Sequence, residues 1–381
     1  MIYLDNAATS HPKPPPVYER MDRVAREVGA NPGRSGHRLA VEAEREISAA
    51  RRAVADLLGA TDPARIIWTL NATDALSMAM KGTLQDGDHV VTTPLEHNSV
   101  ARLLNRLELE GRVRVARVQP GAGGVVSAAD VERAMEESTR LVVLAHAGNV
   151  LGNVQPIAEI GERVRARGRL LLVDGAQSVG VVPLDVTRDA VDLLAFAGHK
   201  GLLGPAGTGG LYVGSRAALR PWREGGTGGD SARPVQPDEY PHALEAGTPN
   251  TAGIAGLGEG ARWVAARGVK ELASHERELA SRLWERLAAL PRVVLYGVPP
   301  GATTLRTGLV TFNVEGQHAE DVGAILDASF DIAVRAGLHC APGAHRFLGT
   351  FPEGAVRVSP GPFTTAQDID ALVEAVRAIA A

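Results

Sequence analysis

Two reactive side chains are scarce in this sequence. Cys340 is its single cysteine, so no disulfide within the chain and no multi-cysteine metal site can form. Only four of the 40 basic residues are lysines, namely Lys13, Lys81, Lys200 and Lys270. Thiol chemistry must therefore use Cys340, and side-chain amine chemistry has four candidates.

The sequence also lacks the patterns of membrane and nucleic-acid proteins. No uninterrupted apolar run approaches the ~20 residues of a transmembrane helix, and residues 1–6 do not pair a basic region with an apolar stretch. The net charge of −4 comes from interspersed signs, without a basic run or a basic-aromatic stripe. These absences predict a cytoplasmic protein with neither a nucleic acid nor a membrane as partner.

The composition is that of a globular protein, with 45% hydrophobic and 22% charged residues. A chain of 381 residues is long for one hydrophobic core, which predicts a large domain and a smaller one. We expect the large domain to span residues 16–255, and the small domain to combine residues 1–15 with 256–381.

Short apolar runs alternate with helical patterns through the first two thirds of the chain, as in the βαβ units of a mostly parallel sheet. The predicted strands of this α/β domain are 66–68, 89–93, 141–144, 171–173, 193–196 and 210–213. A long helical stretch begins near residue 252 and leads to a second group of strands. These later strands are predicted at 293–296, 308–313 and 332–335.

Two helices have clear end signals. Helical spacing of apolar residues from Val41 to Leu58 predicts a helix that Gly59 ends. In the last helix, apolar residues from 369 to 379 share one face, and Thr364 and Gln367 have the spacing of a capping box.

Polar side chains follow several predicted strands, where an open α/β sheet binds its ligand. Residues 71–74 follow the first of these strands and open a helical pattern, which suits either a bound phosphate or an ordinary helix cap. Asp174 follows the strand at 171–173. Its carboxylate suits either a protonated ring nitrogen or a simple turn.

Lys200 lies in the glycine-rich stretch Gly198-His199-Lys200-Gly201, directly after a predicted buried strand. A lysine confined there acquires the lowered pKa that covalent amine chemistry needs, whereas a solvated surface lysine does not. The rarity of lysine in this chain favours the confined interpretation. Together with Asp174, Lys200 matches the way in which proteins hold the aldehyde and ring nitrogen of pyridoxal phosphate (PLP).

Nearly from end to end, the chain resembles the class V aminotransferase-fold cysteine desulfurases and selenocysteine lyases, in particular the group II desulfurases. Eight stretches carry the resemblance in their shared order and spacing: 3–9, 31–34, 95–98, 149–152, 174–177, 198–200, 245–250 and 335–340. The resemblance implies a fold-type I PLP-dependent transferase with a mostly parallel seven-stranded sheet in the large domain and a smaller α+β domain. It also implies a homodimer with a shared active site.

The resemblance assigns roles around the cofactor ring. Lys200 would bind PLP covalently, and Asp174 would contact the ring nitrogen. His97 would stack on the ring. Asn149 and Gln177 would contact the ring hydroxyl.

A second group of residues would hold the phosphate. The resemblance assigns this task to the Ala72 backbone, Thr73 and His199, with Thr248 contributed by the other subunit. Relatives usually carry a hydroxyl residue where this chain has Ala197, which puts one phosphate hydrogen bond in doubt.

The remaining roles concern the substrate. Arg357, Asn149 and Arg34 would contact it, with the Arg357 guanidinium suited to a planar carboxylate. Cys340 would attack the substrate sulfur, and His339 beside it would either favour the thiolate or simply pack.

The reaction implied by the resemblance converts L-cysteine to L-alanine and leaves a persulfide on Cys340, with a sulfur-acceptor protein as a further partner and no metal. The same scaffold suits a selenocysteine or cysteine-sulfinate lyase, an aminotransferase or an epimerase. A non-catalytic sulfur-relay or scaffold protein is a third class, against which the presence of Lys200, Asp174 and His97 argues.

Overall fold

The computed structural model describes residues 1–33, 36–227, 232–299 and 305–381. Its α-helices are α1 (Pro15–Arg23), α2 (Arg38–Leu58), α3 (Ala72–Thr83), α4 (Asn98–Leu109), α5 (Ala128–Ala134), α6 (Ile157–Ala166), α7 (Thr251–Arg267), α8 (Val269–Ala288), α9 (Ala319–Phe330), α10 (Pro342–Leu348) and α11 (Ala366–Ala380). Its strands are β1 (Ile2–Tyr3), β2 (Ile66–Thr69), β3 (His89–Thr92), β4 (Arg114–Arg117), β5 (Thr139–Ala145), β6 (Leu170–Asp174), β7 (Leu193–Ala197), β8 (Gly209–Val213), β9 (Val293–Tyr296), β10 (Val310–Val314), β11 (Ile332–Ala333), β12 (Arg335–Gly337) and β13 (Ala355–Val358). None of the helices in these ranges is long and apolar enough to cross a membrane.

A seven-stranded sheet in the order β2-β8-β7-β6-β5-β3-β4 forms the centre of the larger part of the molecule. Its strands from β7 to β4 run parallel, whereas β8 is antiparallel to both β7 and β2. The predicted mostly parallel α/β sheet is therefore confirmed. The sequence prediction missed β4, because this edge strand has two arginines and is only partly buried.

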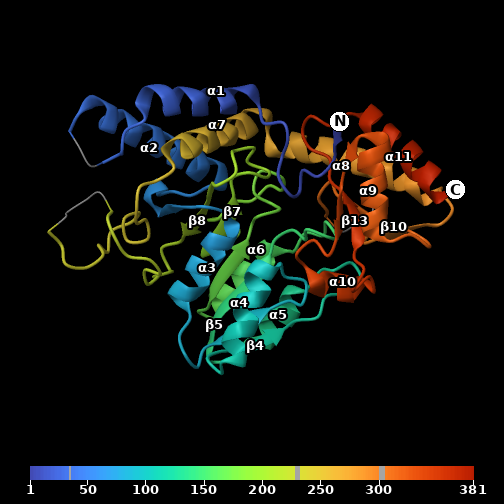
Figure 1. Ribbon diagram of the computed structural model, residues 1–381. Coiled ribbons are helices and arrows are strands. Elements are labelled where there is room, and N and C mark those ends of the chain that lie inside the picture. Colours follow the sequence, from blue (N-terminus) through green and yellow to red (C-terminus); the bar gives the residue numbers. More distant parts are fainter. Residues whose placement is uncertain (34–35, 228–231, 300–304) are drawn as a thin grey trace.

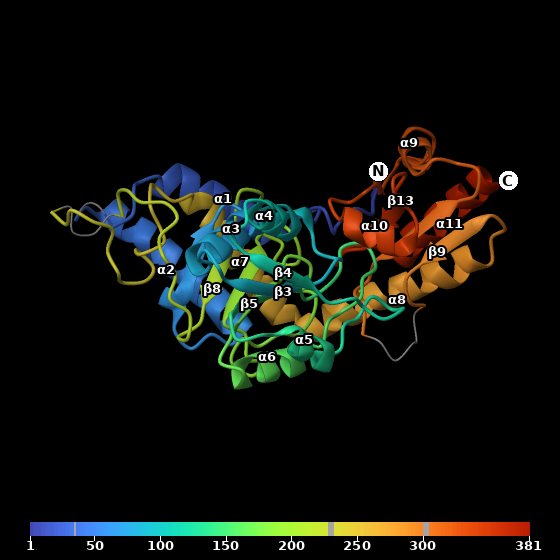
Figure 2. The ribbon, with the colours of Figure 1, turned by 90° about the horizontal axis from the view of Figure 1, so that it is seen from below.

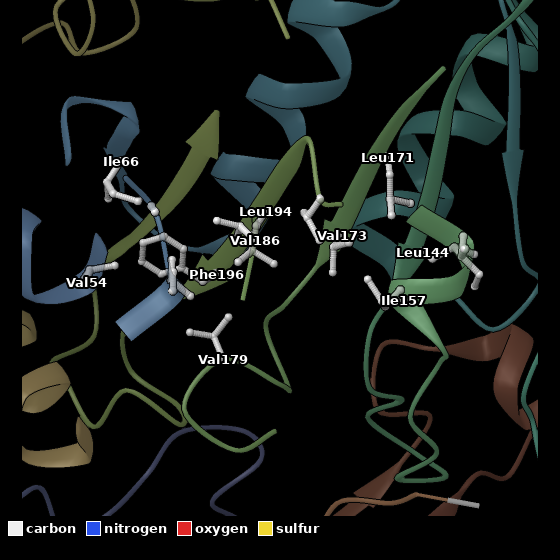
Figure 3. Packing of buried hydrophobic residues seen from close by; sticks show 14 of the residues in the cluster. Val54, Ile66, Leu144, Ile157, Leu171, Val173, Val179, Val186, Leu194 and Phe196 are labelled. Atoms are coloured by element: carbon white, nitrogen blue, oxygen red, sulfur yellow. The ribbon is translucent and has the colours of Figure 1, made fainter. Parts of the chain in front are cut away.

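Helices cover both faces of this sheet, and each face has its own hydrophobic core (Figure 1). On one face, α2, α6 and α7 contribute side chains such as Val54, Ile157 and Leu257. Figure 3 shows Phe196, Leu194 and Val173 of the neighbouring strands packed in this core. Burial on both faces explains why the strands read as continuous apolar runs.

The helix predicted from Val41 to Leu58 is confirmed as α2, which begins three residues earlier. Gly59 ends it in the left-handed conformation, at φ +68°. A Cβ at this position would meet the Asp185 carboxylate, so both the backbone conformation and the close contact require glycine.

A second sheet, in the order β12-β13-β10-β9, is antiparallel and packs with α8, α9 and α11 around a separate core. The predicted α+β character of this part is confirmed. Figure 2 shows this sheet and α9–α11 at one end of the molecule, with α1 and α2 at the other. The predicted strand at 332–335 is in fact two strands, since β11 pairs with β1 and β12 pairs with β13.

Two further sequence predictions need correction. The long helical stretch from residue 252 is broken at Gly268, where φ is +84°, into α7 and α8. The capping box of α11 is formed by Thr365 and Asp368, one residue later than predicted. The Thr364 hydroxyl instead accepts a hydrogen bond from the Gly361 N–H at 2.9 Å.

We propose that the chain forms two domains, as predicted. We place the boundary between them at Gly268, whereas the sequence prediction placed it after residue 255. Residue 255 lies within α7, and the next turns of this helix, at Leu257 and Ala261, still pack in the core of the large sheet. The α8 side chains Leu283 and Leu287 belong to the core of the small sheet.

Candidate active site

Lys200 lies just beyond the carboxyl end of β7, in a turn that the N-terminal segment holds in place. The carbonyl oxygen of His199 accepts hydrogen bonds from the Ser10 N–H and from Lys13 Nζ, both at 2.9 Å. Burial lowers the pKa of Lys200 to about 8, with Arg357 and Arg335 acting in the same direction and Asp174 opposing. The amine is thus far more often neutral near pH 7 than that of a surface lysine.

Asp174 ends β6, the strand next to β7, and its side chain is buried. Burial raises the pKa of this carboxyl, while a hydrogen bond from the Ala176 N–H and the charge of Lys200 counteract the rise. A cationic partner at this carboxylate would therefore favour its charged form and offset the effect of burial.

The start of α3 offers a site for an anion. Asn71 caps the helix by accepting the Asp74 N–H at 2.9 Å, whereas the N–H groups of Ala72 and Thr73 have no acceptor within a helix of this geometry. The Thr73 hydroxyl lies 2.7 Å from the Ser99 hydroxyl. Ser99, which the sequence reasoning missed, adds a hydroxyl to this end of the site.

His97 is the N-cap of α4, and its Nδ1 accepts the Ser99 N–H at 3.1 Å. Burial lowers its pKa to about 4, with further contributions from Lys200 and Arg335, so the ring is neutral at pH 7. A neutral imidazole fixed by its own helix suits stacking against a flat ligand.

Glu96, immediately before His97, is a buried carboxyl that the sequence reasoning also missed. Its two oxygens accept the Thr93 hydroxyl at 2.7 Å and the Ala145 N–H at 2.9 Å, which joins the ends of β3 and β5. Burial raises its pKa to about 8, so it is largely protonated at neutral pH. The available signal was its place three residues after the predicted strand 89–93, within the family-like stretch 95–98.

One cavity brings these groups together. Its lining includes ten residues that carry or flank the predicted cofactor contacts: Ala72, Thr73, His97, Ser99, Asn149, Asp174, Gln177, Ala197, His199 and Lys200. Burial and the neighbouring Lys200 lower the pKa of His199 to about 4. The amide nitrogen of Gln177 donates to the Ala7 carbonyl at 2.9 Å.

The cavity has an anion-binding end at α3, a carboxylate at Asp174 and an amine at Lys200. A phosphate, a protonated ring nitrogen and an aldehyde require this set of partners, so the residues present fit PLP.

The Cys340 loop reaches this cavity from the small sheet. The Cys340 carbonyl accepts the Asn98 N–H at 2.8 Å, one residue from His97, and Asn149 Nδ2 donates to the His339 carbonyl at 2.7 Å. Cys340 is exposed, and Arg335 Nη2 lies 3.5 Å from its Sγ. Arg335 thus supplies the nearby cation.

His339 is a buried, hydrogen-bonded histidine, and its surroundings argue against a charged role beside Cys340. Its side chain is 2% exposed and bonds to Arg335 O at 3.2 Å and to His345 at 3.1 Å. Burial lowers its pKa to about 3, so it carries no charge that would favour a thiolate at neutral pH.

Arg357 on β13 is fully buried and lies opposite Arg335 in the β12–β13 register. Its Nη1 donates to the Asn149 carbonyl at 3.0 Å, and its Nη2 donates to Asp5 Oδ1 at 2.8 Å. These contacts join the guanidinium to Asn149, which borders the cavity.

Thr248 and Arg34 are the remaining predicted site residues. Thr248 is exposed in a separate groove that also includes Arg51, Trp68 and Glu245, and it does not line the cavity that contains Lys200. Arg34 falls outside the described residues.

Comparisons with known proteins give the family. The model of the family Aminotransferase class-V matches residues 2–372. A probable cysteine desulfurase of Methanothermobacter thermautotrophicus is 36% identical, over 100% of this chain and 94% of the relative. A cysteine desulfurase IscS of Cronobacter sakazakii is 35% identical, over 99% of this chain and 92% of the relative.

Comparison with solved structures leads to the same family. The apo structure of the cysteine desulfurase from Thermococcus onnurineus NA1 matches with a TM-score of 0.93 and 33% identity, covering 100% of this chain and 94% of that one. The cysteine desulfurase CsdA from Escherichia coli, in an S-sulfonic acid form, matches with a TM-score of 0.87 and 31% identity, covering 98% and 93%. With its fold, its site and its near-complete alignment to these proteins, the chain belongs to the class V aminotransferase family, among the cysteine desulfurases.

Proposed function

We propose that the protein is a PLP-dependent cysteine desulfurase that converts L-cysteine to L-alanine and takes up the sulfur as a persulfide on Cys340. One observation carries the proposal. The only thiol in the chain is exposed, and its loop is joined to the cavity of Lys200 by hydrogen bonds from Asn98 and Asn149.

The contacts around the cavity support a role for each residue toward the cofactor. Lys200 would hold PLP, Asp174 would keep the ring nitrogen protonated, and His97 would stack on the ring. Asn149 and Gln177 border the cavity beside them and would contact the ring hydroxyl. When bound, PLP supplies a sink for the electrons left at the substrate Cα.

Phosphate binding would use the N–H groups and hydroxyl at the start of α3, together with His199. Ala197 borders the cavity without a hydroxyl, whereas Thr73 and Ser99 both contribute hydroxyls to the same lining. Thr248 would complete the phosphate site of a second copy in a homodimer, which is consistent with its absence from the lining of the cavity in its own chain.

Substrate would be held by the Arg357 guanidinium at its carboxylate, with Asn149 and Arg34 as further contacts. The neutral amine of Lys200 removes the proton from Cα, which its pKa of about 8 permits near neutral pH. The Cys340 thiolate, beside the Arg335 cation, then attacks the substrate sulfur.

This attack forms an S–S bond and breaks the substrate C–S bond. The electron pair of the C–S bond goes to Cβ, which gains a proton and becomes the methyl group of alanine. Cα regains a proton from Lys200, which restores the Cα–H bond of the product. The sulfur on Cys340 is then available to an acceptor thiol, which we propose belongs to a partner protein.

Replacement of the nucleophile tests the proposal. Cys340→Ala leaves the cofactor and carboxylate contacts in place, so PLP absorbance and cysteine binding should persist while alanine formation stops. Mass spectrometry of the wild-type protein after incubation with L-cysteine should detect a persulfide on Cys340. Alanine formation by Cys340→Ala at the wild-type rate would refute the proposal and favour a lyase that uses no protein nucleophile.

A further inference from the structure

The backbone of the Cys340 loop is unusual. His339 and Cys340 are consecutive non-glycine residues in the left-handed region, at φ +50° and +55°. L-residues rarely adopt this conformation, and two in succession persist only where surrounding contacts impose it. Some part of the fold must therefore hold the loop in this shape.

A buried chain of hydrogen bonds lies directly behind the loop. It runs from Arg335 O to His339 Nε2 at 3.2 Å, from His339 Nδ1 to His345 Nε2 at 3.1 Å, and from His345 Nδ1 to the Thr350 hydroxyl at 2.7 Å. The two rings stack with centroids 5.2 Å apart and an interplanar angle of 21°. His345 is completely buried, and His339 and Thr350 are nearly so.

With both rings neutral, only one arrangement of protons satisfies the chain from Arg335 O to the Thr350 hydroxyl. The carbonyl of Arg335 can only accept, so His339 donates from Nε2 and accepts at Nδ1. His345 must then donate from Nε2 to His339 and accept at Nδ1 from the Thr350 hydroxyl. Both rings are neutral in this arrangement, and burial lowers the pKa of His345 to about 4 and that of His339 to about 3.

We propose that His345 is a positioning residue for the reaction, and that through His339 it holds the Cys340 thiol in its left-handed loop beside the cavity residue Asn149. This inference rests on the proposed function, because it assigns a support to the nucleophile named there. The other side of the loop is fixed by the bonds from Asn149 to His339 O and from Asn98 to Cys340 O. The loop is therefore held on one side by the histidine pair and on the other by Asn98 and Asn149.

Two matched pairs of substitutions test whether His345 positions the Cys340 loop or only fills space in the core. His345→Leu removes the N–H donor, whereas His345→Gln keeps one near the place of Nε2. Thr350→Val removes the hydroxyl, whereas Thr350→Ser keeps it. Because Cys340 is the only cysteine, a nitroxide attached to it in the PLP-loaded protein reports the mobility of this loop alone.

We expect His345→Leu and Thr350→Val to add a mobile component to the nitroxide spectrum. In the unlabelled enzymes we expect kcat for cysteine to fall about tenfold or more while KM and PLP absorbance stay unchanged. His345→Gln and Thr350→Ser should resemble the wild-type protein in both the nitroxide spectrum and kcat. If His345→Leu does not fold, the Thr350 pair provides the same comparison.

The inference is overturned if the loop stays immobile in both donor-deficient variants, or if the glutamine and serine variants are as defective as their partners. Either result would mark the histidines as ordinary core packing. A failure of the proposed function would look different, since Cys340→Ala would then still form alanine. The nitroxide spectra would remain decisive in that case, because they do not depend on turnover.

Discussion

At the scale of single residues, burial determines the chemistry of Lys200. Its lowered pKa of about 8 means that the neutral, nucleophilic amine becomes dominant above pH 8, well below the usual 10.5. The rate at which the PLP-free protein captures PLP should therefore rise with pH and level off above about 8. Stopped-flow absorbance at a series of pH values measures this rate.

The control is Lys200→Ala, which should lose the borohydride-reducible attachment of PLP. Lys13 is the matched comparison, because its pKa is also lowered by burial to about 8 and it donates to the carbonyl of His199. Attachment that survives in Lys200→Ala but disappears in Lys13→Ala would move the covalent site to Lys13.

Arg357 is the second residue whose geometry predicts a measurable effect. An ammonium cannot reproduce the two-pronged contact of a guanidinium with a carboxylate, so Arg357→Lys should raise KM for cysteine about tenfold or more. Cofactor absorbance should stay the same. The thermal midpoint must be measured alongside, since the Arg357–Asp5 pair is buried and its disturbance also costs stability.

Arg335→Lys provides the comparison for Arg357→Lys, because Arg335 lies opposite on the neighbouring strand and beside Cys340. We expect this variant to lower kcat more than it raises KM. If Arg335→Lys instead mainly raised KM and Arg357→Lys mainly lowered kcat, Arg335 would be the residue that binds the substrate carboxylate and Arg357 the one that serves Cys340.

At the scale of elements, one hydroxyl and one carboxylate set the start of α11. Thr365 and Asp368 cap α11 reciprocally, so Thr365→Ala should lower the free energy of unfolding by about 1 kcal/mol. Gln367→Ala, at an exposed position in the same turn, should have almost no effect in the same denaturant titration. A larger loss from Gln367→Ala would contradict this assignment of the cap.

At the scale of the whole molecule, the role proposed for Thr248 implies active sites that are shared between two subunits. Lys200→Ala and Thr248→Trp should each be inactive alone, while a refolded mixture forms dimers in which one site has both native residues. Such a mixture should recover about a quarter of the wild-type activity by random pairing. A mixture as inactive as its components would show that Thr248 serves no neighbouring site.

The sequence by itself was enough to predict the sheet and most of the cavity. Buried parallel strands read as apolar runs, and the residues that follow them meet at one edge, so Asp174 and Lys200 could be brought together without coordinates. Family resemblance added His97, Asn149 and Gln177, and the same cavity contains them. Periodicity also located α2 and its glycine stop, because both signals are local.

Only the tertiary structure decided the surroundings of the nucleophile. The cation beside Cys340 is Arg335 and not the adjacent His339, because the loop turns the histidine inward to His345. The edge strand β4 and the break at Gly268 were missed because a polar edge strand and a single glycine leave only a weak hydrophobic pattern. The burial of Glu96 depends instead on a contact between distant segments, its hydrogen bond from the Ala145 N–H, and such contacts leave no trace in the spacing of residues along the chain.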